Sequence, residues 1–451
     1  MRADVEWTSD DPRGAATRAI GTIARRTVLA LALLALSGIA VPVVSAAQSP
    51  AATVFALAPA NAPAAIVDGP DGALWFTERN ANEIGRITIT GEVSQFPIPS
   101  AASNPWAIAL GPDGRLWFTE ADTGMIGSIS PSGTMSEYPL PSGSSPFGIT
   151  AGPDGRLWFT LLGPDQYGNL VPQVGAITVA GAVTIYPVPG VPANISPAVQ
   201  SITQGPDGRL WFTEEDTNAE QFDDIGAITT SGDVTQYPLP EYKSLGVGPA
   251  WLTSGADGRV WFATDFGGTG LGAITTSGDV SYLTGPEVMG QPAVLGGGPI
   301  AFSDGRLWMA QGAQVAWVTP NLQQYGLIAL PASVLPPCGE CGSTALHGLT
   351  PGPDGRIWLT YATSNAGGSV LRAGILAVSG TGGAQCVVPE LVGLTLKAAR
   401  KRLKRHHCRL GRVRQRATPG KADRVLSQSP RRGRILPGGS TVAVTERRRP
   451  S

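Results

Sequence analysis

The sequence predicts an all-β protein of seven repeated units followed by a small α+β domain, and three observations support this prediction. Glycine and proline are frequent, with 59 Gly and 39 Pro in 451 residues, which is incompatible with long helices over most of the chain. A motif centred on tryptophan recurs seven times. Near residue 385 the net charge changes sign, which indicates a second domain.

The composition excludes two other classes of protein. With 42% apolar and 15% charged residues, the chain is too apolar to be disordered, and four Cys are too few for a disulfide scaffold. Residues 385–451 carry 18 basic and 3 acidic residues, whereas residues 1–384 carry 15 basic and 31 acidic ones. The two parts therefore have different partners, or they are partners for each other.

The N-terminus resembles an export signal. Arg25 and Arg26 precede the uncharged, mostly apolar segment Thr27–Ala47, which ends in small residues. We interpret residues 1–47 as a signal peptide with a charged extension, of either the general secretory or the twin-arginine type. An uncleaved membrane anchor is the alternative, because 21 residues can just span a bilayer. Both predict a secreted or envelope-associated, extracytoplasmic protein.

The tryptophan motif indicates a seven-bladed β-propeller. Its first copy occupies residues 69–78, and the others surround Trp117, Trp158, Trp211, Trp261, Trp308 and Trp358, at spacings of 41 to 53 residues. Such a period, built from short β segments and turns, is typical of propeller blades. We interpret the recurring tryptophan as core, because a large ring fills the wedge between neighbouring sheets.

Each unit can be divided into four strands. In the second copy the expected strands are 105–108, 115–120, 126–129 and a segment ending at 139, with a Gly-Pro-Asp-Gly turn after the first. Gly127, in the third strand, is expected to mark close approach between blades. The last copy lacks a fourth strand, and Val54–Pro59 resembles one. We therefore expect a propeller over 48–378, with blade 7 closed by the N-terminal strand, and a Gly-rich linker over 379–385.

Counting outward from the turn of each unit predicts which residues face one another at the mouth. In the last unit His347 and Tyr361 lie equally far from Asp354, so we expect them about 5 Å apart. The same count around the ring gives the candidate ligand-binding residues Trp106, Phe147, Gln200, Glu78, Glu120, Glu214 and Tyr361. Such a mixture suits a small polar-aromatic molecule or a glycan; alternatively, these residues are only strand ends. Cys338 and Cys341 are expected to form a local disulfide.

The Gly-Pro-Asp-Gly-x-Leu-Trp-Phe-Thr-Glu…Ile-Gly-x-Ile pattern resembles the streptogramin B lyases (virginiamycin B lyases) over about residues 53–378. The resemblance implies a carbon–oxygen lyase that opens cyclic depsipeptide esters by elimination, with a catalytic His and a Glu that helps to hold Mg²⁺. His347 occupies the position of the family's His. Tyr361 stands where the Glu is expected, and Pro292–Gly298 lacks a second expected His. The metal ligands therefore remain unknown, and no cofactor is certain.

The basic C-terminal part has the pattern of a small helix-and-strand module. A helix is expected from Thr395 to His406, with Leu396, Ala399 and Leu403 on one face, followed by strands near Val413, over 425–430 and over 439–444. Cys386 and Cys408 flank the helix and are expected to form a disulfide. The Val-Pro-x-Leu-x-Gly opening resembles a PASTA domain over 386–447, followed by a tail over 448–451. The resemblance implies peptidoglycan or muropeptide binding.

The basic charge does not indicate nucleic-acid binding, because residues 385–451 contain no aromatic side chain for base stacking. An anionic cell-wall polymer or lipid headgroup is the expected partner; a solvated basic face, or docking onto the acidic propeller, is the alternative. The sequence therefore predicts an exported propeller that binds a ligand or partner at its mouth and is tethered by a wall-binding module. A magnesium-dependent lyase with His347 as base is the alternative.

Overall fold

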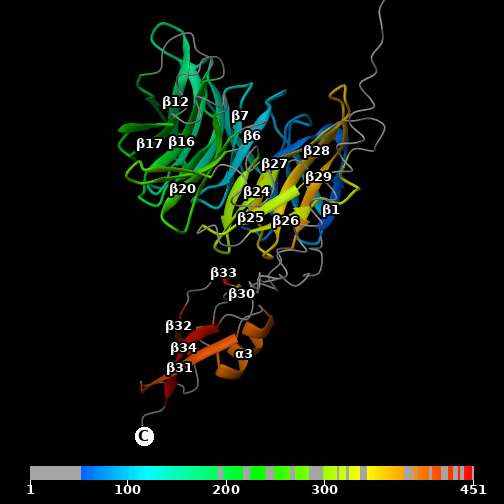
Figure 1. Ribbon diagram of the computed structural model, residues 1–451, viewed down its shortest axis with the longest axis vertical. Coiled ribbons are helices and arrows are strands. Elements are labelled where there is room, and N and C mark those ends of the chain that lie inside the picture. Colours follow the sequence, from blue (N-terminus) through cyan, green and yellow to red (C-terminus); the bar gives the residue numbers. More distant parts are fainter. Residues whose placement is uncertain are drawn as a thin grey trace, which may run out of the picture. The chain divides into compact units, whose positions relative to one another are not determined.

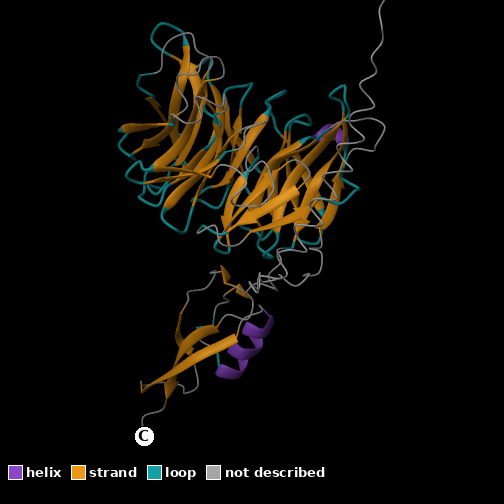
Figure 2. Cartoon of the chain, in the orientation of Figure 1, coloured by secondary structure: helices purple, strands orange, loops and turns teal. Residues whose placement is uncertain are grey.

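The computed structural model describes residues 52–190, 197–216, 224–239, 248–264, 270–283, 298–311, 314–320, 325–335, 343–379, 386–387, 391–392, 394–405, 409–417, 425–429, 435–436 and 441–448. The predicted signal peptide, Cys338, Cys341 and Cys408 lie outside these residues, so the export signal and both disulfides stay predictions. No described helix is long and apolar enough to cross a membrane. The structure is almost entirely β, as predicted (Figures 1 and 2).

Within the described residues, seven antiparallel sheets follow the seven sequence repeats. The first four in chain order contain β2 (Pro63–Asp68), β3 (Leu74–Glu78), β4 (Glu83–Ile87) and β5 (Val93–Pro97); β6 (Pro105–Leu110), β7 (Leu116–Glu120), β8 (Met125–Ile129) and β9 (Met135–Pro139); β10 (Ser145–Ala151), β11 (Leu157–Pro164), β12 (Leu170–Ile177) and β13 (Val183–Pro187); and β14 (Pro197–Ala198), β15 (Ile202–Gln204), β16 (Leu210–Asp216), β17 (Asp224–Ile228) and β18 (Val234–Pro238).

The last three sheets complete the series. They contain β19 (Pro249–Ser254), β20 (Arg259–Thr264), β21 (Leu271–Thr275) and β22 (Val280–Leu283); β23 (Ile300–Ser303), β24 (Arg306–Gln311), β25 (Gln314–Val318) and β26 (Tyr325–Ala329); and β27 (Thr344–Pro351), β28 (Ile357–Ser364) and β29 (Val370–Val378) with β1 (Ala52–Leu57). A short 3-10 helix, η1 (Pro59–Asn61), follows β1. The domain boundaries stay predictions.

The N-terminal strand β1 lies in the sheet of the last repeat. It pairs antiparallel with β29 from Ala52↔Val378 to Leu57↔Ala373, and Figure 1 shows the two strands side by side. Phe55 stacks on Trp358 at 5.4 Å between ring centroids, as Phe96 of β5 stacks on Trp75 at 5.5 Å in the first repeat. β1 thus has both the hydrogen bonds and the aromatic packing of a fourth strand.

The recurring tryptophan forms the core, as predicted: all seven copies are at most 1% exposed. The expectation for the third-strand glycine was wrong. A Cβ on Gly127 would lie 2.1 Å from the ring of Phe118, its cross-strand partner in β7 of the same sheet. The glycine therefore makes room for a phenylalanine ring within one sheet, and it does not mark an approach between blades.

An arginine joins neighbouring repeats at the Gly-Pro-Asp-Gly turn. In the second repeat Arg115 Nε donates to Asp113 at 2.6 Å, and its guanidinium lies 4.7 Å from the centre of the Trp117 ring. Its Nη2 donates to the carbonyl of Val179 in the third repeat at 2.7 Å. Arg156, Arg209, Arg259 and Arg356 reach in the same way to the carbonyls of Thr230, Thr276, Pro320 and Ile89. Because Ile89 belongs to the first repeat, the last of these bonds connects the two ends of the repeat series.

The C-terminal module contains α3 (Leu396–Arg405), packed on a three-stranded sheet in the order β31 (Arg409–Ala417), β34 (Thr441–Arg448), β32 (Val425–Ser429). β30 (Cys386–Val387) pairs with β33 (Ile435–Leu436). The predicted helix is confirmed within one residue at each end. Its apolar face buries Ala399 and Leu403 against a core whose other members are Leu391, Val425, Val442 and Val444.

Candidate functional site

In five repeats the pairing of the first strand is irregular at one place, and these five irregular segments line the site. The pairing register shifts between Pro63 and Ile66 in β2, and the same shift occurs between Pro105 and Ile108 in β6. Corresponding shifts occur in β10, β19 and β27. A β-bulge of this kind turns side chains away from the regular alternation of the strand.

The bulges overturn the predicted cross-strand pairs. Tyr361 pairs with Leu346, and His347 is the extra residue of the bulge between Leu346 and Gly348. Likewise Glu78 pairs with Pro63, and Glu120 pairs with Pro105. Counting outward from the turn assumes an uninterrupted ladder, so one inserted residue shifts every predicted partner by one.

In five repeats the third residue of the tryptophan motif is threonine, and this threonine holds the first strand in place. Thr119 Oγ1 accepts the backbone N–H of Ala107 at 3.0 Å and donates to the carbonyl of Phe147, in the next repeat, at 2.6 Å. Thr360 makes the corresponding bond to the carbonyl of Ala64, which connects the last repeat to the first. The positions of the bulged residues are therefore fixed by hydrogen bonds within and between sheets.

Segments at or beside the first strand of all seven repeats surround one central cavity of about 500 Å³. Of the predicted site residues, Trp106, Gln200 and His347 line it. Phe147 is not among the lining residues, but its ring contacts Trp106 edge-on at 5.5 Å between centroids. The full lining is Ala64, Ala65, Ile66, Arg79, Trp106, Ala107, Gly148, Ile149, Gln200, Ser201, Ile202, Ala250, Trp251, Pro299, Ile300, His347, Gly348 and Leu349.

The remaining predicted ligand-binding residues do not line the cavity. Glu78 and Glu120 are fully buried, Glu214 is 5% exposed and Tyr361 is 2% exposed. Glu78 and Glu120 pair with the prolines that precede the bulges and are enclosed there, whereas the bulged residues that follow those prolines reach the cavity. The mouth therefore brings together an aromatic ring, an amide and an imidazole, without the predicted carboxylates.

His347 is exposed to the cavity. Its pKa is lowered, first because the surrounding walls desolvate the protonated ring and second because the guanidinium of Arg79 repels it. A neutral imidazole can accept a proton or a hydrogen bond at neutral pH, which is what a general base requires.

Arg79 was not among the predicted site residues. It directly follows β3, lies at the cavity wall, and is the only Lys or Arg among the described lining residues. Its guanidinium lies 4.0 Å from the centre of the Trp106 ring. The signal in the sequence was the break in the repeat, because no other copy has a basic residue directly after the Trp-Phe-Thr-x segment.

The described cavity does not fit a magnesium ion. Mg²⁺ prefers carboxylate oxygens, yet no Asp or Glu lines the cavity, and the described residues contain no group of three or more His, Cys, Asp or Glu arranged to hold a metal. Among the described lining residues, the positive charge of Arg79 would repel a divalent cation, and the imidazole nitrogen of His347 is a ligand that Mg²⁺ does not prefer.

Another groove lies on the sheet of the C-terminal module. Its volume is about 440 Å³, and it is lined by the hydroxyl residues Ser427, Ser429 and Thr445, with Gln428, Ala443, Val444 and Arg412. Hydroxyl and amide groups beside an exposed arginine match the hydrogen-bonding groups of a sugar or a short peptide.

Comparison with known proteins agrees with this architecture. The model of the virginiamycin B lyase family matches residues 42–198 and 142–367, and that of the PASTA domain matches residues 387–445. A streptogramin B lyase structure is 29% identical, with a TM-score of 0.59, and the alignment covers 74% of this chain and 99% of that one. A virginiamycin B lyase structure from Staphylococcus aureus is 28% identical, with a TM-score of 0.57, over 73% and 99% of the two chains.

Curated relatives match only a short stretch. The virginiamycin B lyase of Bordetella pertussis is 56% identical over 36 residues, which is 8% of this chain and 12% of that protein. That of Mycolicibacterium smegmatis is 48% identical over 40 residues, which is 9% and 14% of the two. The chain thus spans about an eighth of the length of these relatives. The family model, however, extends over most of the propeller, and the chain therefore belongs to the virginiamycin B lyase family and carries a PASTA domain at its C-terminus.

Proposed function

We propose that this protein is an extracytoplasmic ligand-binding propeller, held at the cell envelope by its PASTA domain. The observation that carries the proposal is the central cavity, where Trp106, Gln200 and His347 converge from three different repeats. A cavity lined mostly by apolar groups, with a few placed polar groups, is the usual form of a small-molecule site. PASTA domains generally bind peptidoglycan or the cell wall, which supports an extracytoplasmic location.

A lyase is the second candidate, and one observation favours it. His347 lines the cavity as a neutral imidazole at the family's catalytic position. Against it, Tyr361 replaces the expected Glu and is buried, so the described residues provide no carboxylate for the metal. Elimination beside an ester develops negative charge on oxygen, which the metal normally stabilises. We therefore rank binding above catalysis.

Incubating the full chain with quinupristin and Mg²⁺ separates the two candidates. A structure of a catalytically inactive S. aureus virginiamycin B lyase with quinupristin makes this compound the natural probe. We expect saturable binding by equilibrium dialysis, no isobaric ring-opened product by chromatography and mass spectrometry, and less than about a tenfold change in Kd for His347→Ala. A magnesium-dependent product that His347→Ala abolishes would establish the lyase instead.

The PASTA domain is expected to bind the wall by more than charge. Helix α3 exposes Lys397, Arg400 and Lys401 on one face, while the groove on the sheet offers hydroxyl groups. Screening weakens exposed charge pairs at high salt but has little effect on hydrogen bonds within a groove. We expect most of the full chain that sediments with purified peptidoglycan to remain bound at ~0.5 M NaCl. A steep loss of binding to peptidoglycan as salt rises, parallel to the loss of binding to a simple polyanion, would mean that charge alone holds the domain on the wall.

A further inference from the structure

Arg79 breaks the pattern of the repeats at the cavity wall. The residue directly after the Trp-Phe-Thr-x segment is Ala121, Leu162, Glu215, Asp265, Gly312 or Ala362 in the other six copies. The other six repeats are built without a basic residue at this place, so the fold of a repeat does not require the half-buried arginine. Its role therefore belongs to the cavity.

The guanidinium of Arg79 is held from two directions. Its Nε donates to Asn104 Oδ1 at 2.8 Å, and its plane lies over the Trp106 ring, 4.0 Å from the centroid. Trp106 is in turn packed edge-on against Phe147. Stacking on an aromatic face and a hydrogen bond at Nε together fix both the position and the orientation of an arginine side chain.

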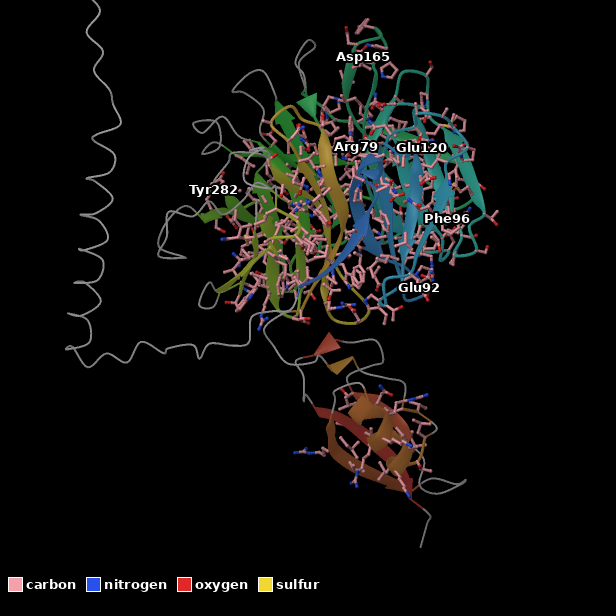
Figure 3. The ribbon with its side chains drawn as sticks, turned by 90° about the vertical axis from the view of Figure 1, so that its right-hand side faces the viewer. Arg79, Glu92, Phe96, Glu120, Asp165 and Tyr282 are labelled. Atoms are coloured by element: carbon pink, nitrogen blue, oxygen red, sulfur yellow. The ribbon has the colours of Figure 1, made fainter. Side chains whose placement is uncertain are left out.

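The loop that carries Asn104 is itself fixed. Asn82 Oδ1 accepts the backbone N–H of Ser103 at 2.7 Å, and its Nδ2 donates to the carbonyl of Ser100 at 2.8 Å. Asn104 has a positive φ of 52° and donates through Nδ2 to Asp122 at 3.1 Å. A second asparagine thus fixes the conformation from which Asn104 reaches Arg79. Figure 3 shows Arg79 and Glu120 at one end of the propeller and Glu92 at the other.

The two outer nitrogens of Arg79 form no hydrogen bond with any described residue. The side chain is partly buried, and desolvation lowers its pKa. No Asp or Glu is among the described lining residues, so the positive charge at this wall lacks a counter-ion within the cavity. A guanidinium with two parallel free N–H donors matches the two oxygens of a carboxylate.

We propose that Arg79, stacked on Trp106, binds a carboxylate of the cavity's ligand through its two outer nitrogens. A carboxylate fits better than a phosphate, because Arg79 offers one positive charge that exposed Asp122 partly offsets, and because most of the wall is Ala, Ile and other apolar groups. The ligand is therefore a monoanionic, partly apolar molecule. This proposal rests on the proposed function, since it requires that the cavity binds a ligand.

The test uses the ring proton resonances of His347 in the full chain as a reporter within the cavity. The chain has three His, and His347→Ala assigns the signal. The probes are N-acetylphenylalanine and its neutral amide, which differ only in the carboxylate. We expect the acid to shift the signal saturably, with a Kd at least about tenfold lower than that of the amide. Arg79→Gln should reduce this ratio to about one.

Arg306→Gln is the matched control. Arg306 lies 4.1 Å from the centre of the Trp317 ring, so it has the same stacking on tryptophan, but it does not line the cavity. This variant should keep the preference for the acid. Equal affinity for acid and amide in the wild type, or a preference that survives Arg79→Gln, would overturn the carboxylate site and leave a ligand-binding cavity intact. Absence of a saturable shift with either probe would contradict both proposals.

Discussion

Replacing Phe55 with Ala is expected to lower the free energy of unfolding of the propeller by about 2–3 kcal/mol. The Phe55 ring stacks on Trp358 of the last repeat with an interplanar angle of 5°. It also packs against the first repeat, where a Cβ added to Gly91 would lie 2.5 Å from the ring. Because Phe55 is half-buried, the expected loss is below that of a fully buried phenylalanine.

The first repeat offers a matched comparison. Phe96 is also half-buried, stacks on Trp75 at 5.5 Å, and packs against Gly133 of the second repeat. Phe96 lies in a repeat whose four strands follow one another in the chain, whereas Phe55 lies in a strand that comes from the N-terminus and pairs with the last repeat. Urea unfolding should give equal losses for Phe55→Ala and Phe96→Ala if β1 completes the propeller. A near-zero effect of Phe55→Ala beside a large effect of Phe96→Ala would show that β1 contributes little.

Much of the fold could be predicted because each repeat has its own local signals. The Gly-Pro-Asp-Gly turn requires a positive φ at its last residue, such as Gly114 at 75°, and the tryptophan after it is large enough to fill the space between sheets. The bulge had no such signal. A bulge forms where two residues of the first strand, instead of one, lie opposite a single residue of the second strand. This arrangement depends on hydrogen bonds such as the one from the Ala107 N–H to Thr119, which the spacing of residues does not reveal.

The site was accordingly predicted in part. His347, Trp106 and Gln200 stand out as unusual residues at a repeated position, and they line the cavity. The glutamates were expected at the mouth from an uninterrupted count of residues, whereas Glu78 and Glu120 are fully buried and do not line the cavity. Arg79 was overlooked because its role depends on a loop of the next repeat, residues 100–104, which no pattern in its own repeat indicates.

Changing Glu120 and Glu214 to Gln is expected to flatten the dependence of stability on pH. Glu120 is fully buried and its Oε1 has no hydrogen-bond partner among the described residues. The Glu214 side chain is 5% exposed, and its Oε1 also has no hydrogen-bond partner among them. Burial raises the pKa of each carboxyl from 4.5 to about 7, and in Glu120 the charge of Glu137 adds to this effect. Each folded side chain thus keeps its proton in a pH range where the unfolded one has lost it.

The sign follows from proton linkage. Between pH 4.5 and about 7 the folded state binds more protons than the unfolded state, so the free energy of unfolding falls as pH rises and levels off above 7. Each site contributes a fall of about 3 kcal/mol over that range. Glutamine imitates the protonated acid at every pH. The E120Q/E214Q variant should therefore match the wild type near pH 5 and exceed its stability at pH 8, measured by urea unfolding at both values.

Glu78 provides a control in which both carboxylate oxygens are hydrogen-bonded. Burial raises the pKa of Glu78 too, but these hydrogen bonds oppose the shift. Glu78 occupies the same position in the first repeat, but Asn61 donates to its Oε1 at 2.9 Å and Gln95 donates to its Oε2 at 2.7 Å. In E78Q one of these donors would face the new amide NH₂, at a cost of about 1–2 kcal/mol. The same substitution should thus destabilise one repeat and, at pH 8, stabilise two others. A loss of stability in both variants at pH 8 would contradict the unpaired carboxylates, because it would mean that Glu120 and Glu214 are charged and well bonded in the folded protein.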